Sequence, residues 1–324
     1  MKRTDNPGSA ASGYILLNKK PGITSFQALD EIKKTFPSCK VGHTGTLDKF
    51  ASGLLLVLAG RAVKLSPWFS GCDKEYDGTI RFGTETATLD PEGAVVAEAP
   101  PPDMESLQAV LPGFRGNILQ RPPAYSALHI HGKRAYALAR SGTPVEMPER
   151  PAVVYALELL SFEPPLARIR VRCSKGTYIR SLARDIALAA GSRGHLMALT
   201  RTCAAGFRLS QAVDSPVRSD LHPLRPETFA ALGIFRVEAE DGAVRDILCG
   251  RPPAPLFESG ALRFFPGEDA CSLSLLDDFG REPRISRDQN SSPACAGVFD
   301  KDGNLLAVIE RTEGGRWVYG CVYA

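Results

Sequence analysis

The sequence has no apolar stretch that approaches the roughly 20 residues a helix needs to cross a bilayer,. Its opening segment, Met1–Ser12, is short and polar, and it lacks the apolar centre and cleavage pattern of a secretory signal,. These absences argue against a helical membrane protein and against export. We therefore expect a cytoplasmic protein with a flexible tail at residues 1–12.

The eight cysteines form no Cys-x-x-Cys pair. A disulfide framework is unusual in a chain of this size without a secretory signal, and zinc ligands with suitable spacing are absent, so we expect inert thiols. The sequence also lacks a phosphate loop, a dinucleotide-binding glycine motif that follows a strand, a His-Glu-x-x-His motif and a nucleophile elbow. We therefore expect neither a metal nor a cofactor.

An excess of charge of either sign is also missing, because the net charge is only +3. The charge is unevenly spread, however. Residues 101–200 carry 13 basic and 7 acidic side chains, whereas residues 201–324 carry 14 and 18. A polyanion such as RNA would be attracted first to the middle of the chain, although such a bias also suits an ordinary solvated surface.

The length of 324 residues favours two domains,. We assign residues 13–232 to the first. Residues 214–226, rich in Pro, Arg and Asp, are interpreted as the linker. Residues 233–324 show short apolar segments with Gly and Pro turns, such as Leu305–Glu310 and Trp317–Val322, which predict a small, mainly β domain,.

Residues Leu166–Cys173 alternate between apolar and basic side chains, which predicts a half-buried antiparallel strand,. A helix is expected to follow, capped by Thr177 and continuing to about Ala190. The basic face of the strand suits either contact with RNA phosphates or simple solvation. That face consists of Arg168, Arg170 and Arg172.

The segment Gly42–Asp48 places one His and one Asp among glycines and threonines. Glycines permit tight turns and a close approach of the backbone to a ligand. An isolated aspartate or histidine in such a loop is more often structural. Because the familiar catalytic motifs are missing elsewhere, the carboxylate of Asp48 is still the best candidate for a nucleophile or base.

The stretch Lys40–Leu55, which reads KVGHTGTLDKFASGLL, closely resembles the catalytic signature of the TruB family of tRNA pseudouridine-55 synthases. Further family segments follow the same order along residues 13–210. They are Lys19–Ser25, Lys74–Tyr76 with Arg81–Gly83 and Thr86–Asp90, Arg121–Leu128, Gly132–Tyr136, Ser174–Arg180, and Leu199 with Arg201. Several motifs in one order are far more specific than any one of them.

This resemblance implies an isomerase that acts on tRNA, with an α+β catalytic domain built on a mixed, largely antiparallel sheet. It implies that Asp48 is the catalytic carboxylate, that Tyr76 stacks on the target base and takes part in proton removal, and that Arg180 pairs with Asp48. It also implies substrate-contacting roles for a second group of residues. These are His43, which holds the flipped nucleotides open, Asp90 of the uridine-contacting loop, Tyr178 and Leu199 of the pocket wall, and Lys19.

Three positions depart from the family pattern: Lys49 replaces a proline, Pro21 is shifted by one residue, and Ala87 replaces a carboxylate. None of them is one of the three catalytic candidates. The C-terminal residues resemble a PUA-type RNA-binding domain only loosely. We expect tRNA, through its T arm, as the partner of a monomeric enzyme. A non-catalytic tRNA-binding or folding factor and an aspartate-dependent hydrolase are the alternatives.

Overall fold

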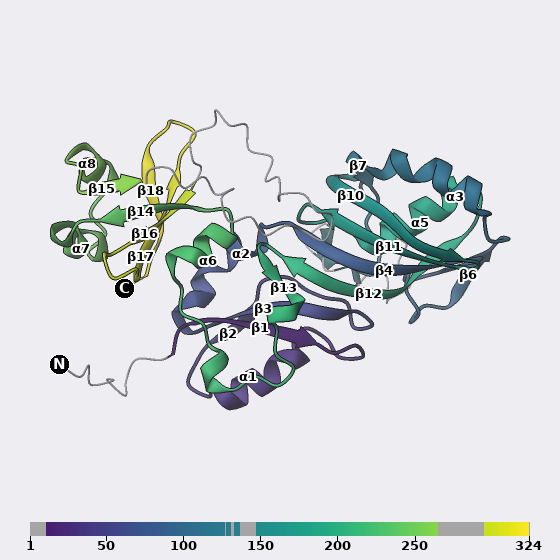
Figure 1. The fold of residues 1–324 in the computed structure, drawn as a ribbon, viewed down its shortest axis with the longest axis horizontal. Coiled ribbons are helices and arrows are strands. Elements are labelled where there is room, and N and C mark those ends of the chain that lie inside the picture. Colours follow the sequence, from purple (N-terminus) through teal and green to yellow (C-terminus); the bar gives the residue numbers. More distant parts are fainter. Residues whose placement is uncertain (1–10, 127, 131–132, 137–146, 265–294, 324) are drawn as a thin grey trace.

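A nine-stranded mixed sheet organises the larger part of the molecule (Figure 1). The computed structural model describes residues 11–126, 128–130, 133–136, 147–264 and 295–323, so the expected tail lies almost wholly outside them. The order along the sheet is β1-β3-β12-β4-β11-β10-β7, with β2 on β3 and β13 on β12. The strands are β1 (Gly13–Lys19), β2 (Val41–His43), β3 (Ser52–Ala59), β4 (Lys74–Phe82), β7 (Gly116–Gln120), β10 (Arg150–Glu163), β11 (Leu166–Cys173), β12 (Gly194–Ala204) and β13 (Phe207–Arg208).

The sheet has two halves that meet where β12 runs parallel to β3, while its other neighbouring strands are antiparallel. Gly53 lies at this junction, opposite Arg201 in the register, with φ at +103°. A Cβ atom at Gly53 would lie 2.4 Å from the carbonyl oxygen of Arg201. Glycine is therefore required there both for its conformation and for the close approach of two backbones.

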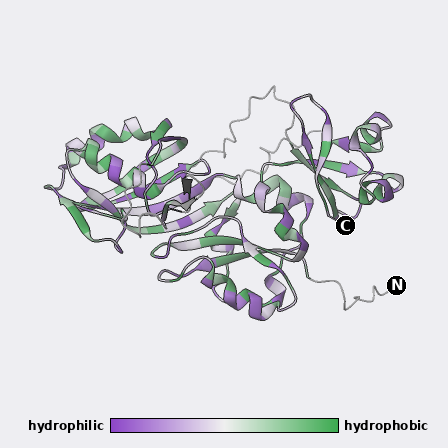
Figure 2. Cartoon of the chain, turned by 180° about the vertical axis from the view of Figure 1, so that it is seen from behind, coloured by the Kyte–Doolittle hydropathy of each residue, from purple (hydrophilic) through white to green (hydrophobic). Residues whose placement is uncertain are grey.

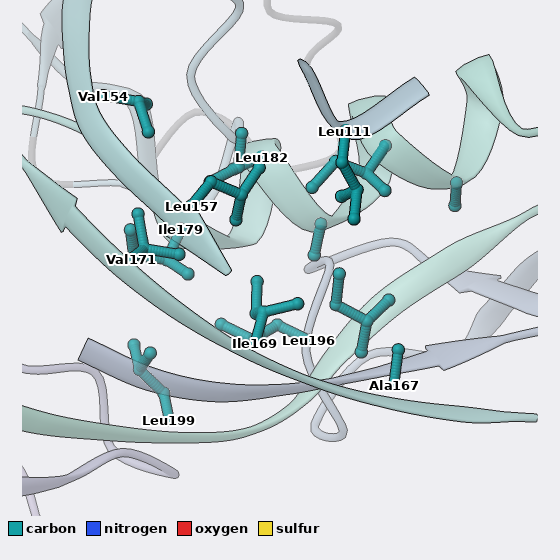
Figure 3. Close-up of a cluster of buried hydrophobic side chains, with 14 of the residues drawn as sticks. Leu111, Val154, Leu157, Ala167, Ile169, Val171, Ile179, Leu182, Leu196 and Leu199 are labelled. Atoms are coloured by element: carbon teal, nitrogen blue, oxygen red, sulfur yellow. The ribbon is translucent and has the colours of Figure 1, made fainter. Parts of the chain in front are cut away.

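Helices α3 (Met104–Val110) and α5 (Ile179–Ala189) contribute to the core over one face of the β4–β11–β10 half. Figure 3 shows Ile179 and Leu182 of α5 packed above Ile169 and Val171 of β11. The predicted strand Leu166–Cys173 is confirmed. The predicted cap is wrong, because Tyr178 is the N-cap residue and the hydroxyl of Thr177 instead donates to the carbonyl of Ser174 at 2.9 Å.

The β1–β3 half is buried on both faces, which explains the continuous apolar run of β3. Helix α1 (Asp30–Thr35) covers one face through Ile32. On the other face lie α2 (Ser66–Ser70), α6 (Pro226–Ala231) and part of the C-terminal region. In Figure 2 many helices carry both hydrophobic and hydrophilic residues, as expected for elements with one buried side,.

The C-terminal region forms a second sheet, with the order β15-β14-β16-β17-β18. Its strands are β14 (Phe235–Ala239), β15 (Leu262–Phe264), β16 (Cys295–Phe299), β17 (Leu305–Arg311) and β18 (Trp317–Val322), accompanied by helices α7 (Asp241–Leu248) and α8 (Pro253–Glu258). The remaining strands form two hairpins: β5 (Thr84–Thr86) with β6 (Val95–Glu98), and β8 (His129–Ile130) with β9 (Lys133–Arg134). The α+β class expected from the sequence, with a small C-terminal β unit, is confirmed.

Residues 214–226 are not a free linker, contrary to the sequence interpretation. His222 and Tyr14 exchange two backbone hydrogen bonds of 2.9 Å, which attach this segment to β1. Directly after it, Phe229 of α6 packs edge-to-face against Phe299 of the second sheet, with centroids 5.2 Å apart. In the part of the chain that the structure covers, no helix is long and apolar enough to cross a membrane.

Candidate active site

A cavity of about 470 Å³ opens between the loop that follows β2, strand β4 and the segment that leads into α5. This volume exceeds that of a single nucleobase and suits a flipped nucleotide. The end of β2 and the loop after it contribute His43 to Asp48. The segment before α5 and the first turn of α5 contribute Ser174 and Gly176 to Arg180. Residues more than 130 positions apart in the chain therefore face the same cavity.

Asp48 and Arg180 form a two-pronged ion pair at the cavity. The Nε of Arg180 lies 2.9 Å from Asp48 Oδ2, and its Nη2 lies 3.2 Å from Asp48 Oδ1. The Arg180 side chain is 6% exposed, whereas that of Asp48 is 36% exposed. The carboxylate is thus held from behind by the guanidinium and stays accessible from the cavity, as a nucleophile or base requires.

Arg180 has no free donor. Its remaining N–H groups donate to the carbonyls of Thr88, at 2.8 Å, and Tyr125, at 3.0 Å, and to Asp90 Oδ2 at 3.2 Å. Together with the two bonds to Asp48, these contacts use all five donors of a guanidinium. Arg180 is therefore placed to orient carboxylates and has no N–H left for a phosphate.

Asp90 is the second carboxylate on Arg180. Its side chain is 8% exposed and does not line the cavity. The structure thus places Asp90 behind the Asp48–Arg180 pair, while a direct contact of Asp90 with uridine stays a prediction. Burial raises the pKa of Asp48 above its ordinary value, and the nearby Asp90 adds to this, while Arg180 opposes both,.

Lys19 supports the Asp48 loop from below. It is 1% exposed, and its ammonium donates to the backbone carbonyls of Ala51, at 2.6 Å, and Lys20, at 2.9 Å. Burial lowers the pKa of Lys19 to about 8,. Lys19 does not line the cavity, so its observed contact is with the loop, and its contact with substrate stays a prediction.

Tyr76, Tyr178, Leu199 and His43 all line the cavity, as the sequence motifs predict. Burial raises the pKa values of Tyr76 and Tyr178, so both phenols carry their proton at neutral pH,. Burial lowers the pKa of His43, and the charge of Arg201 adds to this effect, so its imidazole is neutral. These three side chains therefore form an uncharged, largely aromatic part of the wall around Asp48.

Two basic cavity residues were not assigned roles from the sequence. Arg201 is 2% exposed, and Lys74 donates to the carbonyls of Ser70 and Cys72. Both belong to segments that match the family pattern, so their position in a motif could have marked them as site residues. Over the residues that the structure describes, no group of three or more His, Cys, Asp or Glu is arranged to hold a metal ion.

Arg168, Arg170 and Arg172 lie on the opposite face of the sheet from the Asp48 cavity. The register pairs Val171, not these arginines, with Tyr76. Arg170 is bound by both oxygens of Asp77, at 2.8 and 3.0 Å, and Arg172 lies opposite Glu75. Carboxylates of β4 thus offset much of the positive charge of this face. The contact of this face with RNA stays a prediction, but the excess positive charge that suggested it is reduced.

Comparison with known proteins places this arrangement in a family. Residues 33–179 match the TruB family pseudouridylate synthase (N terminal domain). A protein named tRNA pseudouridine synthase B from Francisella philomiragia is 46% identical over 213 residues, which cover 65% of this chain and 70% of that protein. The chain belongs to the TruB family.

A TruB relative from Bordetella avium, also named tRNA pseudouridine synthase B, is 48% identical over 210 residues, covering 64% of this chain and 86% of its own length. Among solved structures, a Cbf5–Nop10–Gar1 complex superposes with a TM-score of 0.65 at 21% identity, covering 99% of this chain and 91% of the other. The archaeal box H/ACA sRNP Nop10–Cbf5 complex gives a TM-score of 0.64 at 19% identity, with 97% and 87% covered. These superpositions extend the TruB-type fold through the C-terminal sheet, consistent with a PUA-like domain.

Proposed function

We propose that this TruB family enzyme isomerises the uridine at position 55, in the T loop of tRNA, to pseudouridine. The observation that carries the proposal is the accessible carboxylate of Asp48, clamped by Arg180 in a cavity with Tyr76 on its wall. The names of the relatives support tRNA as the substrate, and the resemblance of the sequence motifs supports position 55. The partner is tRNA, bound by a monomeric, cytoplasmic enzyme.

The reaction needs the uridine outside its base stack, because the glycosidic bond is inaccessible inside a folded RNA. In the cavity, Tyr76 supplies an aromatic surface for the flipped base. Asp48 then acts at the ribose, either by attacking C1′ or by removing the proton from C2′. Either route breaks the bond between N1 and C1′ while the detached uracil stays bound in the cavity.

The ring then turns, and C5 forms a bond to C1′. Attack at C1′ requires the carboxylate to leave as this bond forms, and abstraction at C2′ requires the proton to return. In both cases the proton on C5 is lost and N1 gains one. The product has the same atoms as the substrate, so no co-reactant is needed. The residues of this chain bind, orient and exclude water, and Asp48 either forms a transient bond to C1′ or takes and returns the C2′ proton.

Asp48 must be ionised for either route. Its burial opposes ionisation, and the two bonds from Arg180 favour it,. Arg180 thus has a double task, because it sets the direction of the carboxylate oxygens and stabilises their charge. Asp90, on the other side of the same guanidinium, fixes its plane.

The test is to incubate the purified protein with unmodified tRNA, without added cofactor, and to map pseudouridine. We expect one product at position 55. Asp48→Asn should abolish it while leaving tRNA affinity within several-fold of the wild type, because binding rests on many phosphate and base contacts. Product from Asp48→Asn above a trace rate would refute the catalytic assignment. RNA binding by an inactive wild type would support the alternative of a folding factor.

A further inference from the structure

Arg201 of β12 is a buried arginine with an unusual set of partners. Its side chain donates from Nε to the carbonyl of Leu54 at 2.6 Å and from Nη2 to the carbonyl of Gly45 at 3.2 Å. Over the described residues, no carboxylate lies within 4.0 Å of its guanidinium, whereas Arg180 has two. A buried positive charge with neutral partners lowers stability, so its place at the cavity needs an explanation.

The position of Arg201 in the sheet gives one. In the register it lies opposite Gly53 of β3 on one side and opposite Tyr76 of β4 on the other. Arg201 and Tyr76 both line the cavity, and the positive charge of Arg201 acts on the Tyr76 phenol. One side chain therefore connects the two halves of the sheet, the loop that carries Asp48, and the catalytic tyrosine.

The position of Arg201 restricts the phenol of Tyr76. A guanidinium carries only donors, so the phenol oxygen can act towards it only as an acceptor. The loop residue Gly45, held by the same guanidinium, is three positions before Asp48. One rigid, planar group therefore lies next to both the phenol and the Asp48 loop.

We propose that Arg201 is a positioning residue, which holds the Tyr76 hydroxyl in place relative to the Asp48 loop. The proposal rests on the reaction proposed above. A lysine cannot replace it, because a single ammonium on a flexible stem cannot bond the separated carbonyls of Leu54 and Gly45 in one plane,. The positive charge also favours the ionised form of the phenol, against the effect of burial on the Tyr76 pKa,.

The first test is a double-mutant cycle under single-turnover conditions with saturating tRNA. Arg201→Met should slow the wild type by roughly 10- to 100-fold, the range expected for two directly coupled residues. In a Tyr76→Phe background the same change should cost less than about 3-fold, since the group being positioned is gone. Equal losses in both backgrounds would overturn the proposal. Arg201→Lys should recover only part of the rate.

The second test does not depend on activity. 3-Fluorotyrosine placed at position 76 allows its phenol pKa to be followed by fluorine NMR in the folded protein. Removal of the adjacent positive charge in Arg201→Met should raise this pKa. The control is Arg225→Met, because Arg225 also donates to neutral oxygens, the carbonyl of Asp302 and the side chain of Asn304, both at 3.0 Å. An unchanged phenol pKa in Arg201→Met would overturn the proposal.

The proposed function and the positioning role of Arg201 are refuted by different results. A wild type that forms no pseudouridine would refute the proposed function. An active wild type with no coupling between Arg201 and Tyr76, in rate or in phenol pKa, would refute only the positioning role.

Discussion

Replacing Arg180 with methionine removes the partner of two carboxylates at once. Asp90 is 8% exposed and would be left buried and unpaired, which costs about 3–5 kcal/mol,. The Asp48 side chain is 36% exposed, so solvent screens its charge once Arg180 is gone. The loss of this ion pair adds at most about 1 kcal/mol to the destabilisation,. Because domains are typically stable by about 5–15 kcal/mol, the variant should fold with a clearly lower Tm.

The catalytic effect should be larger than the effect on stability suggests. Without Arg180, the pKa of Asp48 rises further, because burial is no longer opposed by the guanidinium,. A smaller fraction of the enzyme then carries the carboxylate at neutral pH, and that carboxylate is no longer oriented. We expect a loss on the order of 10²- to 10³-fold, similar to the loss of one preorganised electrostatic group. Arg180→Lys should lose less.

The assay is the single-turnover rate at saturating tRNA, measured across pH at a temperature where circular dichroism shows the variant folded. The acid limb of the profile should move to higher pH in Arg180→Met, so that part of the rate returns in alkali. Arg193→Met is the matched control, because its partner Glu85, at 3.0 Å, lies outside the cavity. A normal saturating rate for Arg180→Met, with weaker binding and a smaller salt dependence, would show a phosphate contact and refute this reasoning.

Three further outcomes are expected. Activity should survive metal chelation once the tRNA has been folded in magnesium, and loss of activity restored only by one specific divalent ion would contradict this. Gly53→Ala should lower the Tm strongly, because its methyl would lie 2.4 Å from the Arg201 carbonyl oxygen, whereas Gly22→Ala, with φ at +85° and open space around it, should cost only about 1–2 kcal/mol,. Burial lowers the pKa of Lys19 to about 8 from 10.5, so above about pH 8 the unfolded chain binds one more proton than the folded one,. Denaturant unfolding should therefore show a gain in stability from pH 7.5 to pH 10 that is smaller in Lys19→Met, and an equal gain in both proteins would contradict the assignment.

The loop around Asp48 and the strand Leu166–Cys173 were predictable because each depends on local sequence, whereas the α+β class followed from the family resemblance. Alternation fixes a strand from eight residues, and the motif around Asp48 is one continuous segment. The pairing of Asp48 with Arg180 followed from the resemblance alone. Its geometry, 2.9 Å at Nε, depends on a chain separation of 132 residues that no local pattern contains.

The features that the sequence did not reveal also depend on contacts between distant residues. The arginines of β11 read as a basic face because the opposing Asp77 and Glu75 are almost a hundred residues away in sequence. Residues 214–226 have the composition of a linker, and only the backbone of β1 makes them part of the fold. The partners of Arg201 could not be predicted, because they are backbone carbonyls, which every residue has whatever its side chain.

The hydrophobic core shared by the two sheets has a mechanical consequence. Phe229 and Phe299 belong to the same cluster as Leu16 and Leu54, and a Cβ atom at Gly320 of β18 would lie 2.7 Å from the ring of Trp68 in α2. A hinge at this place would have to open a packed core. The second sheet is therefore held at a set distance from the Asp48 cavity, and the two move as one rigid body.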